Sequence, residues 1–337
     1  MAMVIGKVAL VAFVVGLVLT AVVRAIGRRT ALLDGSGASG HAKPALRPVP
    51  NIGGIAIFWA IAAALGAAGA LGWIAESREL WIVMATALGL HVVGLIDDRR
   101  PLGPVPKLTA QILAGLVPPM VLGVRSLELL DAHVGGPWAS IAITTAWFVV
   151  VTNAMNFMDN MDGIAASTAG IAAAGVAVIA TEHMGTEVAV LTAAIVGACA
   201  AFLVFNAPGP KTWGGGATIF MGDGGSLVLG FLLAYATVRV SYVADASTAR
   251  VSAVFVPLCV LAIPLYDLVA VCAIRITQGK SPMVGDQQHF THRLRKRGLS
   301  DGRVCAVVAG CVAITVVAGL ILTRLDGIGP WLVAAQV

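Results

Sequence analysis

The chain has 337 residues, of which 58% are hydrophobic and only 12% are charged, and its formal net charge is +5. Soluble domains carry about 25% charged residues, so this composition excludes an ordinary soluble globular protein. Apolar runs long enough to cross a bilayer recur along the whole chain. The composition therefore predicts an all-α, polytopic integral membrane protein. The positive charge indicates basic cytoplasmic loops and gives no indication of nucleic-acid binding.

Ten membrane-spanning helices are expected, in one membrane domain that covers residues 1–337. Their predicted ranges are 4–23, 52–72, 80–96, 107–124, 138–153, 163–180, 187–205, 225–242, 251–274 and 304–323. The first run resembles a signal peptide, but no clear small-residue cleavage site follows it, so we expect it to remain as a span. The five cysteines lie in apolar segments without a CxxC pair, so neither a zinc site nor a disulfide framework is indicated.

Lysine and arginine gather in the loops of one face of this predicted topology. The positive-inside rule makes that face cytoplasmic in a plasma (inner) membrane, and the even number of spans then puts both termini outside. Every polar cluster of the chain also falls in the cytoplasmic loops. The chemistry is therefore expected at the cytoplasmic face, with cytoplasmic reagents.

The first polar cluster follows the third predicted span, where Asp97 and Asp98 precede Arg99 and Arg100. Neighbouring helical residues point about 100° apart, so the two carboxylates need not serve one ligand. One could bind or deprotonate a substrate while a cation holds the other. Alternatively, the two arginines simply neutralise them.

The richest polar stretch lies between the fifth and sixth predicted spans, where Asn153, Asn156, Asp159 and Asp162 follow at a spacing of three. On a helix this spacing forms a slowly winding stripe, which suits a helix end that turns into a loop. Carboxylates and carboxamides are the hard oxygen ligands that a magnesium–phosphate complex needs. The alternative is a polar loop in which Asp162 caps the next helix, and we expect that cap in either case.

Asp223 opens the eighth predicted span within the sequence Met-Gly-Asp-Gly-Gly-Ser. Glycines before a helix let the backbone approach a phosphate, and an acid there could hold the accompanying metal. A plain helix cap is the alternative. Asp267, inside the ninth predicted span, is a functional candidate because ionisable groups within spans are costly. Arg275 lies too far along the same helix to pair with it directly.

Two histidines, His289 and His292, precede Arg293 and a basic run in the last cytoplasmic loop. Such a set suits a diphosphate and its nucleotide. The basic run at 295–297 could instead face lipid headgroups. Together, the clusters favour phosphoryl transfer at the membrane surface, with a metal, carboxylates that hold it, cationic groups and a lipid phosphate as acceptor.

At these residues the chain resembles the polyprenyl-phosphate N-acetylhexosamine-1-phosphate transferases, over roughly residues 48–299. GLIDD is similar to the Asp-Asp motif of that family, and NAMNFMDNMDGIA to NxxNxxDGxDG(L/I)A. FMGDGGS is similar to FMGDxGS, DQQHFTHRL to DxxHxHHRL, and RPVPNIGGIAI to a Pro-x-Pro-x-x-Gly-Gly segment. Five motifs in the right order along the chain, all on one predicted face, make the resemblance very specific.

The resemblance implies transfer of a sugar phosphate from a UDP-N-acetylhexosamine to undecaprenyl phosphate, with release of UMP, in a lipid bilayer. It implies Mg²⁺, with Mn²⁺ as a substitute, and by analogy it allows a homodimer. It places Asp223 and Asn156 at the metal and assigns catalysis to Asp97, Asp98, Asp159 and Asp162. The implied substrate-binding residues are Lys43, Asn153, Asn156, Asp267, His289, His292 and Arg293.

The histidine loop and the Gly-Gly segment look like the branch that uses UDP-GlcNAc for polysaccharide initiation (WecA/TagO-like). The branch that takes UDP-MurNAc-pentapeptide (MraY-like) is the alternative. Four features depart from the motifs: Asn160 replaces a glycine, Thr291 replaces the middle histidine, Gly224 stands where threonine is common, and Lys43 lacks its flanking arginine and histidine. An ion-coupled transporter and a polyprenyl transferase with aspartate-rich loops are less favoured, because no repeat and no DxxxD pair is found.

Overall fold

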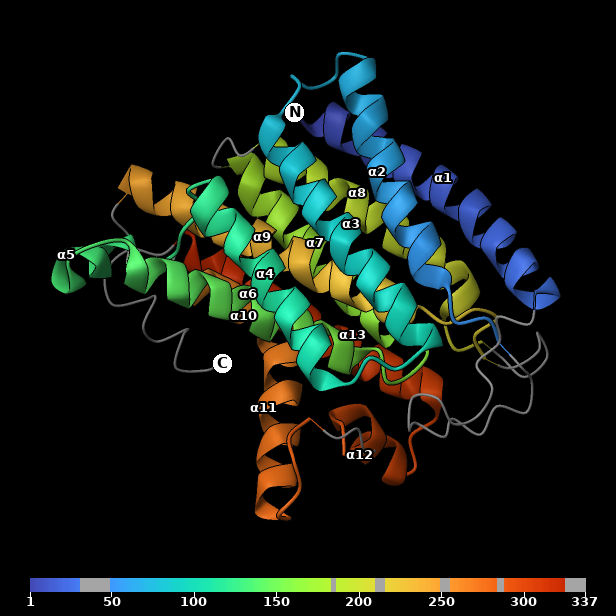
Figure 1. Ribbon diagram of the computed structural model, residues 1–337. Helices are drawn as coiled ribbons and strands as arrows, with labels where there is room; N and C mark the ends of the chain where they lie inside the picture. The colour runs from blue at the N-terminus through green and yellow to red at the C-terminus, as the bar shows by residue number, and fades with distance from the viewer. Residues whose placement is uncertain (31–48, 183–185, 210–215, 249–254, 284–287, 325–337) are drawn as a thin grey trace.

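A computed structural model describes residues 1–30, 49–182, 186–209, 216–248, 255–283 and 288–324 of the chain. Within these ranges the regular elements are helices packed as a bundle (Figure 1). They are α1 (Ala2–Arg29), α2 (Gly53–Ala70), α3 (Arg78–Arg99), α4 (Pro104–Val121), η1 (Glu128–Leu130), α5 (Asp131–Val134), α6 (Trp138–Met158), α7 (Ile164–Glu182), α8 (Thr186–Asn206), α9 (Asp223–Thr248), α10 (Val256–Val260), α11 (Ala262–Thr277), α12 (Phe290–Lys296) and α13 (Asp301–Leu322). The predicted all-α class is confirmed.

Seven of the described helices are long and apolar enough to cross a bilayer, namely α1, α3, α6, α7, α8, α9 and α13. Helix α2 is apolar but shorter, and α4 coincides with the predicted span 107–124 without belonging to this set. The chain is therefore a multi-pass membrane protein, as predicted. The count of ten spans stays a prediction.

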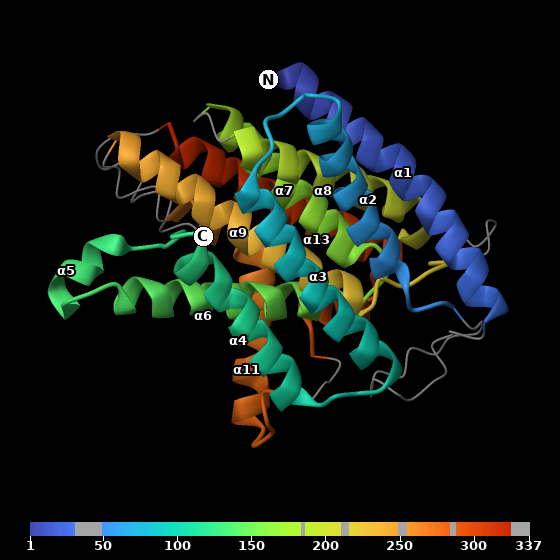
Figure 2. The same cartoon turned by 45° about the horizontal axis from the view of Figure 1, so that its top comes forward.

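The ninth predicted span, 251–274, is not one continuous helix. Its described part divides at Leu261 into α10 and α11. Pro264 explains the break, because a proline ring clashes with the carbonyl four residues earlier and cannot donate a backbone hydrogen bond. Helix α11 then leaves the bundle steeply, as Figures 1 and 2 show. The expectation of a single helix over this range is wrong for this physical reason.

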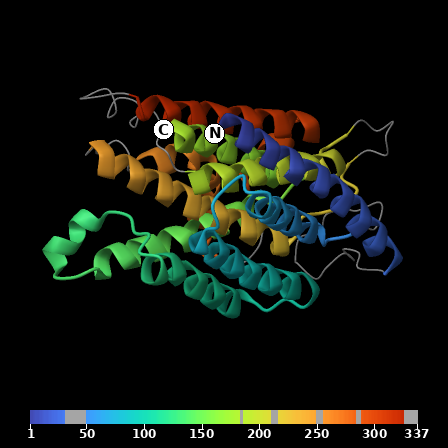
Figure 3. The same ribbon diagram turned by 90° about the horizontal axis from the view of Figure 1, so that it is seen from above.

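Helix α9 lies at the centre of the bundle, and 89% of its segment Asp223–Val240 is buried. It packs against α2, α3, α6, α7 and α8. Figure 3 shows α13 along one side of the molecule and α3 and α4 along the other, with α8 and α9 between them. A helix that is apolar on all sides, as α9 is, is stable only when neighbours or lipid surround it.

Small residues allow α1 and α8 to approach closely. Ala12, Gly16 and Thr20 are spaced by four along α1 and are all buried. A Cβ added at Gly16 would lie 2.8 Å from the Cβ of Ala201, and one added at Gly197 would lie 2.1 Å from the carbonyl oxygen of Ala9. Close packing through small side chains is how helices associate when no water drives them together.

We expect Gly16→Leu to destabilise the α1–α8 contact, because the new side chain has no room. Overpacking of this kind costs about 1–3 kcal/mol. The matched control is Gly6→Leu on the same helix, where nothing lies within 4 Å of an added Cβ. Thermal unfolding in detergent should show a lower midpoint for Gly16→Leu only. Equal midpoints for the two variants would contradict this packing.

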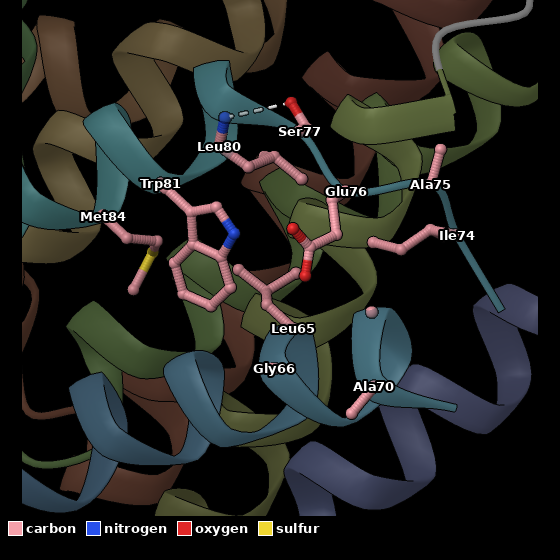
Figure 4. Close-up of a pocket in the computed structure, with 11 residues that line it drawn as sticks. Leu65, Gly66, Ala70, Ile74, Ala75, Glu76, Ser77, Leu80, Trp81 and Met84 are labelled. Atoms are coloured by element: carbon pink, nitrogen blue, oxygen red, sulfur yellow. Dashed lines mark hydrogen bonds between the residues drawn. The ribbon is translucent and has the colours of Figure 1, made fainter. Parts of the chain in front are cut away.

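The two ends of the bundle differ in character. The start of α1 and the end of α13 lie at one end, where Lys7 stacks over Trp73 in the α2–α3 turn and Arg324 pairs with Glu182 at the end of α7. A small, mainly apolar cavity of about 110 Å³ lies in that turn, lined among others by Glu76 and Trp81 (Figure 4). The opposite end holds the sequence motifs that are rich in acids and glycines.

Candidate active site

Glycines allow three helix ends to converge at the acidic end of the bundle. A Cβ added at Gly54 of α2 would lie 2.3 Å from the backbone nitrogen of Gly225, and one added at Gly94 of α3 would lie 2.5 Å from the backbone carbon of Asp223. Gly222 has a φ of +70°, a conformation that favours glycine. The glycines of three motifs therefore serve one purpose, which is to bring α2 and α3 against the start of α9.

Backbone hydrogen bonds tie the Gly-Gly segment to the segment before α9. Phe220 N donates to Pro50 O at 2.8 Å, and Gly53 N and Gly54 N donate to the carbonyl oxygens of Phe220 and Met221 at 2.9 and 2.8 Å. Both segments run in parallel over this short stretch. This pairing fixes where α9 begins, and hence where Asp223 lies.

Asp98 holds the first turn of α9. Its Oδ1 accepts from Asp223 N at 2.9 Å and from Asn51 Nδ2 at 3.2 Å, and its Oδ2 accepts from Gly224 N at 3.1 Å. These backbone N–H groups have no partner within their own helix, so a carboxylate is well placed to accept from them. The structure therefore gives Asp98 an anchoring contact that the sequence did not indicate.

His91 fixes the same turn from the other side. Its Nδ1 lies 2.7 Å from Gly224 O, and a carbonyl oxygen only accepts, so Nδ1 carries the proton. Its ring stacks on Phe58 with a centroid distance of 5.0 Å. Sequence reasoning missed His91, which has no polar neighbours in its span. The one signal was an ionisable residue inside an apolar span.

Lys107 links two of the predicted acids. Its Nζ lies 3.2 Å from Asp97 Oδ2 and donates to Asp223 Oδ2 as well, while Asp97 Oδ1 accepts from Leu102 N at 2.8 Å. Arg99 and Arg100 are exposed, and among the described residues neither forms a recorded ion pair with Asp97 or Asp98, so the alternative in which they neutralise the acids is not supported. Lys107 was also missed. The sequence feature that could have identified Lys107 is its place in the first turn of a predicted helix. The helix dipole disfavours positive charge there unless an acid lies nearby.

Asn156 completes this chain of polar contacts from α6. Its Nδ2 donates to Asp223 Oδ1 at 2.7 Å and to Ser226 Oγ at 2.9 Å. Asp97, Lys107, Asp223 and Asn156 thus form a continuous set of side chains from four helices. The sequence predicts only that the Asp-Asp, Asn-rich and Gly-Asp-Gly motifs lie on one face of the membrane, and the structure brings residues of all three into contact.

The other residues of the Asn153–Gly163 stretch have separate roles. Asp159 directly follows the last turn of α6 and is close enough to Asp98 to interact with it electrostatically. The expectation that Asp162 caps the next helix is wrong, because its Oδ2 accepts from Ala217 N at 3.0 Å, in the segment before α9, and no hydrogen bond recorded among the described residues joins it to the start of α7. Asn206 supports the same region, because it accepts from Gly163 N and donates to Ile219 O, both at 2.9 Å.

Asn153 is engaged away from the acids. Its carboxamide pairs with that of Gln111 on α4, and its Nδ2 also donates to Val149 O. The polar stripe predicted from the spacing of three therefore divides. Its first member joins two helices, and its later members face the acidic end.

A second cluster joins α11 to α12. Asp267 is 1% exposed; its Oδ2 lies 2.7 Å from His289 Nδ1, and its Oδ1 accepts from Phe290 N at 2.6 Å. The ring of Phe157 meets the His289 ring edge-on, and the Arg275 guanidinium lies 5.1 Å from the centre of the Phe157 ring. Arg275 does not pair with Asp267, as expected, and donates to Pro282 O. Asp267 orients His289 and helix α12.

His292 and Arg293 follow on α12. The His292 ring centre is 5.9 Å from that of His289, and the Arg293 guanidinium lies over the rings of Tyr266 and Phe290. Phe157, next to Asn156, therefore connects the basic cluster to the acidic one. Lys43, together with Asp286 and Gln287 of the histidine loop, lies outside the described residues.

The donor groups at the acidic end are carboxylates and a carboxamide, which suit Mg²⁺ better than a softer metal. Among the described residues no three His, Cys, Asp or Glu side chains converge as a complete metal cage. Mg²⁺ in phosphoryl-transfer sites takes one or two carboxylates and completes its shell with water and substrate phosphate. Asp223 and Asn156 fit that partial set, because they supply the carboxylate and carboxamide oxygens that Mg²⁺ prefers.

This combination of a membrane-embedded helical bundle and an acid–lysine cluster at one end is typical of an enzyme that acts on phosphates at a membrane surface. The model of glycosyl transferase family 4 matches residues 80–241. The decaprenyl-phosphate N-acetylglucosaminephosphotransferase of Mycobacterium tuberculosis (strain ATCC 25618 / H37Rv) is 31% identical over 288 residues, which cover 77% of this chain and 69% of that protein. The chain belongs to this family.

Two further relatives bear on the branch. A probable undecaprenyl-phosphate N-acetylglucosaminyl 1-phosphate transferase of Bacillus subtilis (strain 168) is 26% identical and covers 86% of this chain and 78% of its own length. A phospho-N-acetylmuramoyl-pentapeptide-transferase of Halalkalibacterium halodurans is 35% identical but covers only 47% of this chain and 51% of its own. The predicted family is confirmed, and the Mycobacterium and Bacillus relatives, which match most of the chain, are named for N-acetylglucosamine phosphate transfer, whereas the muramoyl-pentapeptide transferase matches only part of it.

Proposed function

We propose that this protein transfers N-acetylglucosamine-1-phosphate from UDP-N-acetylglucosamine to undecaprenyl phosphate or a related polyprenyl phosphate. UMP is the second product, and the lipid-linked sugar starts a cell-envelope polysaccharide. The observation that carries this proposal is the continuous set Asp97–Lys107–Asp223–Asn156 at one end of a membrane bundle. The proposed activity follows the names of the relatives that match most of the chain.

In the proposed reaction, an oxygen of the lipid phosphate attacks the phosphorus that bears the sugar. The bond from this phosphorus to the bridging oxygen of UDP breaks, and that oxygen leaves with UMP. Neither oxidant nor reductant is needed. Catalysis then consists of positioning two anionic phosphates and stabilising the charge that builds up between them.

We assign the roles from the contacts. Asp97 accepts the proton of a monoprotonated lipid phosphate, and Lys107 places positive charge between the two phosphates. Asp98 anchors the turn that carries Asp223. The predicted catalytic residues Asp159 and Asp162 line the nucleotide side, and His292 and Arg293 bind the nucleotide diphosphate.

Asp223 and Asn156 are the residues that would hold Mg²⁺, with Mn²⁺ as a substitute. When bound, the ion would spread the negative charge of the diphosphate and so make it easier to attack. In the structure, Lys107 Nζ donates to Oδ2 of this Asp223 carboxylate. We therefore expect Lys107 to move toward a phosphate when the metal and substrate are present.

We further propose that the acidic end of the bundle faces the cytoplasm, where the nucleotide sugar is made. The positive-inside count supports this orientation. An ion-coupled transporter fits less well, because transporters place coordinating groups near the bilayer midplane. The acids described here lie at the end of α3 and the start of α9.

Purified protein in detergent should release UMP from UDP-N-acetylglucosamine, and release should require both undecaprenyl phosphate and Mg²⁺. A panel of UDP-sugars then identifies the preferred donor, and EDTA should abolish release. A folded protein that releases no UMP from any UDP-sugar would refute the transferase. A preference for UDP-MurNAc-pentapeptide would refute the N-acetylglucosamine assignment alone.

A further inference from the structure

Two residues that depart from the sequence motifs contact each other. Asn160 lies in the link between α6 and α7, and Thr291 lies in the first turn of α12. Thr291 Oγ1 donates to Asn160 Oδ1 at 2.5 Å, although 131 residues separate them along the chain. Both are buried, with exposed fractions of 1% for Thr291 and 7% for Asn160.

The carboxamide of Asn160 is fully oriented by its partners. Its Nδ2 donates to Phe157 O at 2.6 Å, and a carbonyl oxygen can only accept. Oδ1 therefore points to Thr291, whose hydroxyl must be the donor. This side chain joins the C-terminal end of α6 to the first turn of α12, in a place where an unpaired polar atom would be costly.

The positions of these residues matter for the site. Asn160 directly follows Asp159, and Thr291 directly precedes His292. The Asp267 contacts to His289 and Phe290 hold the same turn of α12 against α11. Helix α12 is thus fixed at two points. Among the hydrogen bonds recorded for the described residues, only the one between Asn160 and Thr291 joins α12 directly to the segment that carries the acids.

We propose that Asn160 and Thr291 are a positioning pair that sets how the nucleotide sugar is bound. The proposal rests on the function proposed above. Neither side chain touches the reacting phosphates. Their hydrogen bond fixes the distance between the acids of the Asn153–Gly163 stretch and the basic residues His292 and Arg293, which together would hold the UDP part of the donor.

The pair also explains why both departures occur together. The similar motifs have glycine at position 160 and histidine at position 291. Glycine in place of Asn160 would remove the carboxamide and leave empty space, and histidine in place of Thr291 would replace the hydroxyl with a larger imidazole ring. In a close-packed interior, histidine beside Asn160 would overfill the site, and glycine beside Thr291 would leave a void and an unpaired hydroxyl. We infer that the two exchanges are energetically coupled.

Thr291→Val keeps the shape of the side chain and removes its donor. We expect the KM for UDP-N-acetylglucosamine to rise about tenfold, because Asn160 loses its buried partner and α12 shifts. The KM for the lipid phosphate should stay within about twofold. Thr291→Ser, which keeps the hydroxyl, should retain most of the wild-type affinity. The matched control is Thr315→Val, whose hydroxyl bonds only within α13, to Val312 O.

A double-mutant cycle tests the coupling. Asn160→Gly and Thr291→His alone should each lower kcat/KM for the nucleotide sugar, and the double variant should be more active than either single variant. A double variant whose loss equals the product of the two single losses would overturn the coupling. Equal KM values for Thr291→Val and wild type would overturn the positioning role.

Binding separates this inference from the proposed function. UDP-N-acetylglucosamine with Mg²⁺ should raise the thermal unfolding midpoint of the wild-type protein, and Thr291→Val should need about tenfold more nucleotide sugar for the same rise. If the wild-type protein binds the nucleotide sugar but releases no UMP, the transferase function is refuted. The positioning role of the pair is still supported if Thr291→Val needs about tenfold more nucleotide sugar for the same rise in unfolding midpoint. Identical binding curves for the two proteins refute the pair, whatever the activity.

Discussion

Asp223→Asn is expected to reduce UMP release by at least about 100-fold while the protein stays folded. Asp223 receives both Lys107 Nζ and Asn156 Nδ2, and it is the acid that we assign to the metal. An amide keeps the shape but loses the negative charge, and removal of one preorganised electrostatic contact in an active site costs about 10²–10³ in rate.

The control for this charge change is Asp301→Asn. Asp301 is about half exposed and pairs with Arg295 at the surface, 3.2 Å away, so its loss should leave UMP release within about twofold of wild type. Both variants should be compared for thermal unfolding in detergent before their rates are compared. Full activity in a stably folded Asp223→Asn protein would refute its assigned role.

Gly94→Ala is expected to lower UMP release by about 100-fold, although the new methyl group carries no charge. An added Cβ would lie 2.5 Å from the backbone carbon of Asp223, so α3 and the start of α9 must separate. A displacement of about 1 Å in an active site is enough for a loss of this size. Such a result would show that helix packing sets the position of Asp223.

Gly89→Ala on the same helix provides the matched control. Nothing lies within 4 Å of an added Cβ there, and alanine is the better helix former by about 1 kcal/mol. We expect normal or slightly higher stability and unchanged activity. Similar losses in both variants would mean that a glycine is needed in α3 for a reason other than the approach to α9.

The acidic site was predictable from the sequence in part. Asp97, Asp98, Asn156, Asp159 and Asp223 were identified because polar side chains beside apolar spans are conspicuous, and the structure brings them to one end of the bundle. The partners of these residues were not predictable. Lys107 counted only as one of many basic loop residues, although it lies between Asp97 and Asp223.

Several roles changed once the side chains had neighbours. Asp98 supports the turn before α9, Asn153 pairs with Gln111, and Asp267 holds His289. Sequence spacing gives the direction of a side chain on its own helix. It does not give the helix that packs against that side, so it could not distinguish a residue that contacts substrate from one that supports a neighbour.

The class of protein, the location of most helices and the acidic motifs could all be recognised from the amino-acid sequence. These depend on local properties, because the length and hydrophobicity of a segment decide whether it can span a bilayer. The sequence did not reveal the convergence of glycines at Gly54, Gly94 and Gly225, or the bond between Asn160 and Thr291, and these became visible in the folded bundle. Each of these depends on how segments far apart in the chain pack together, and that packing is settled by shape and hydrogen-bond satisfaction across the whole bundle.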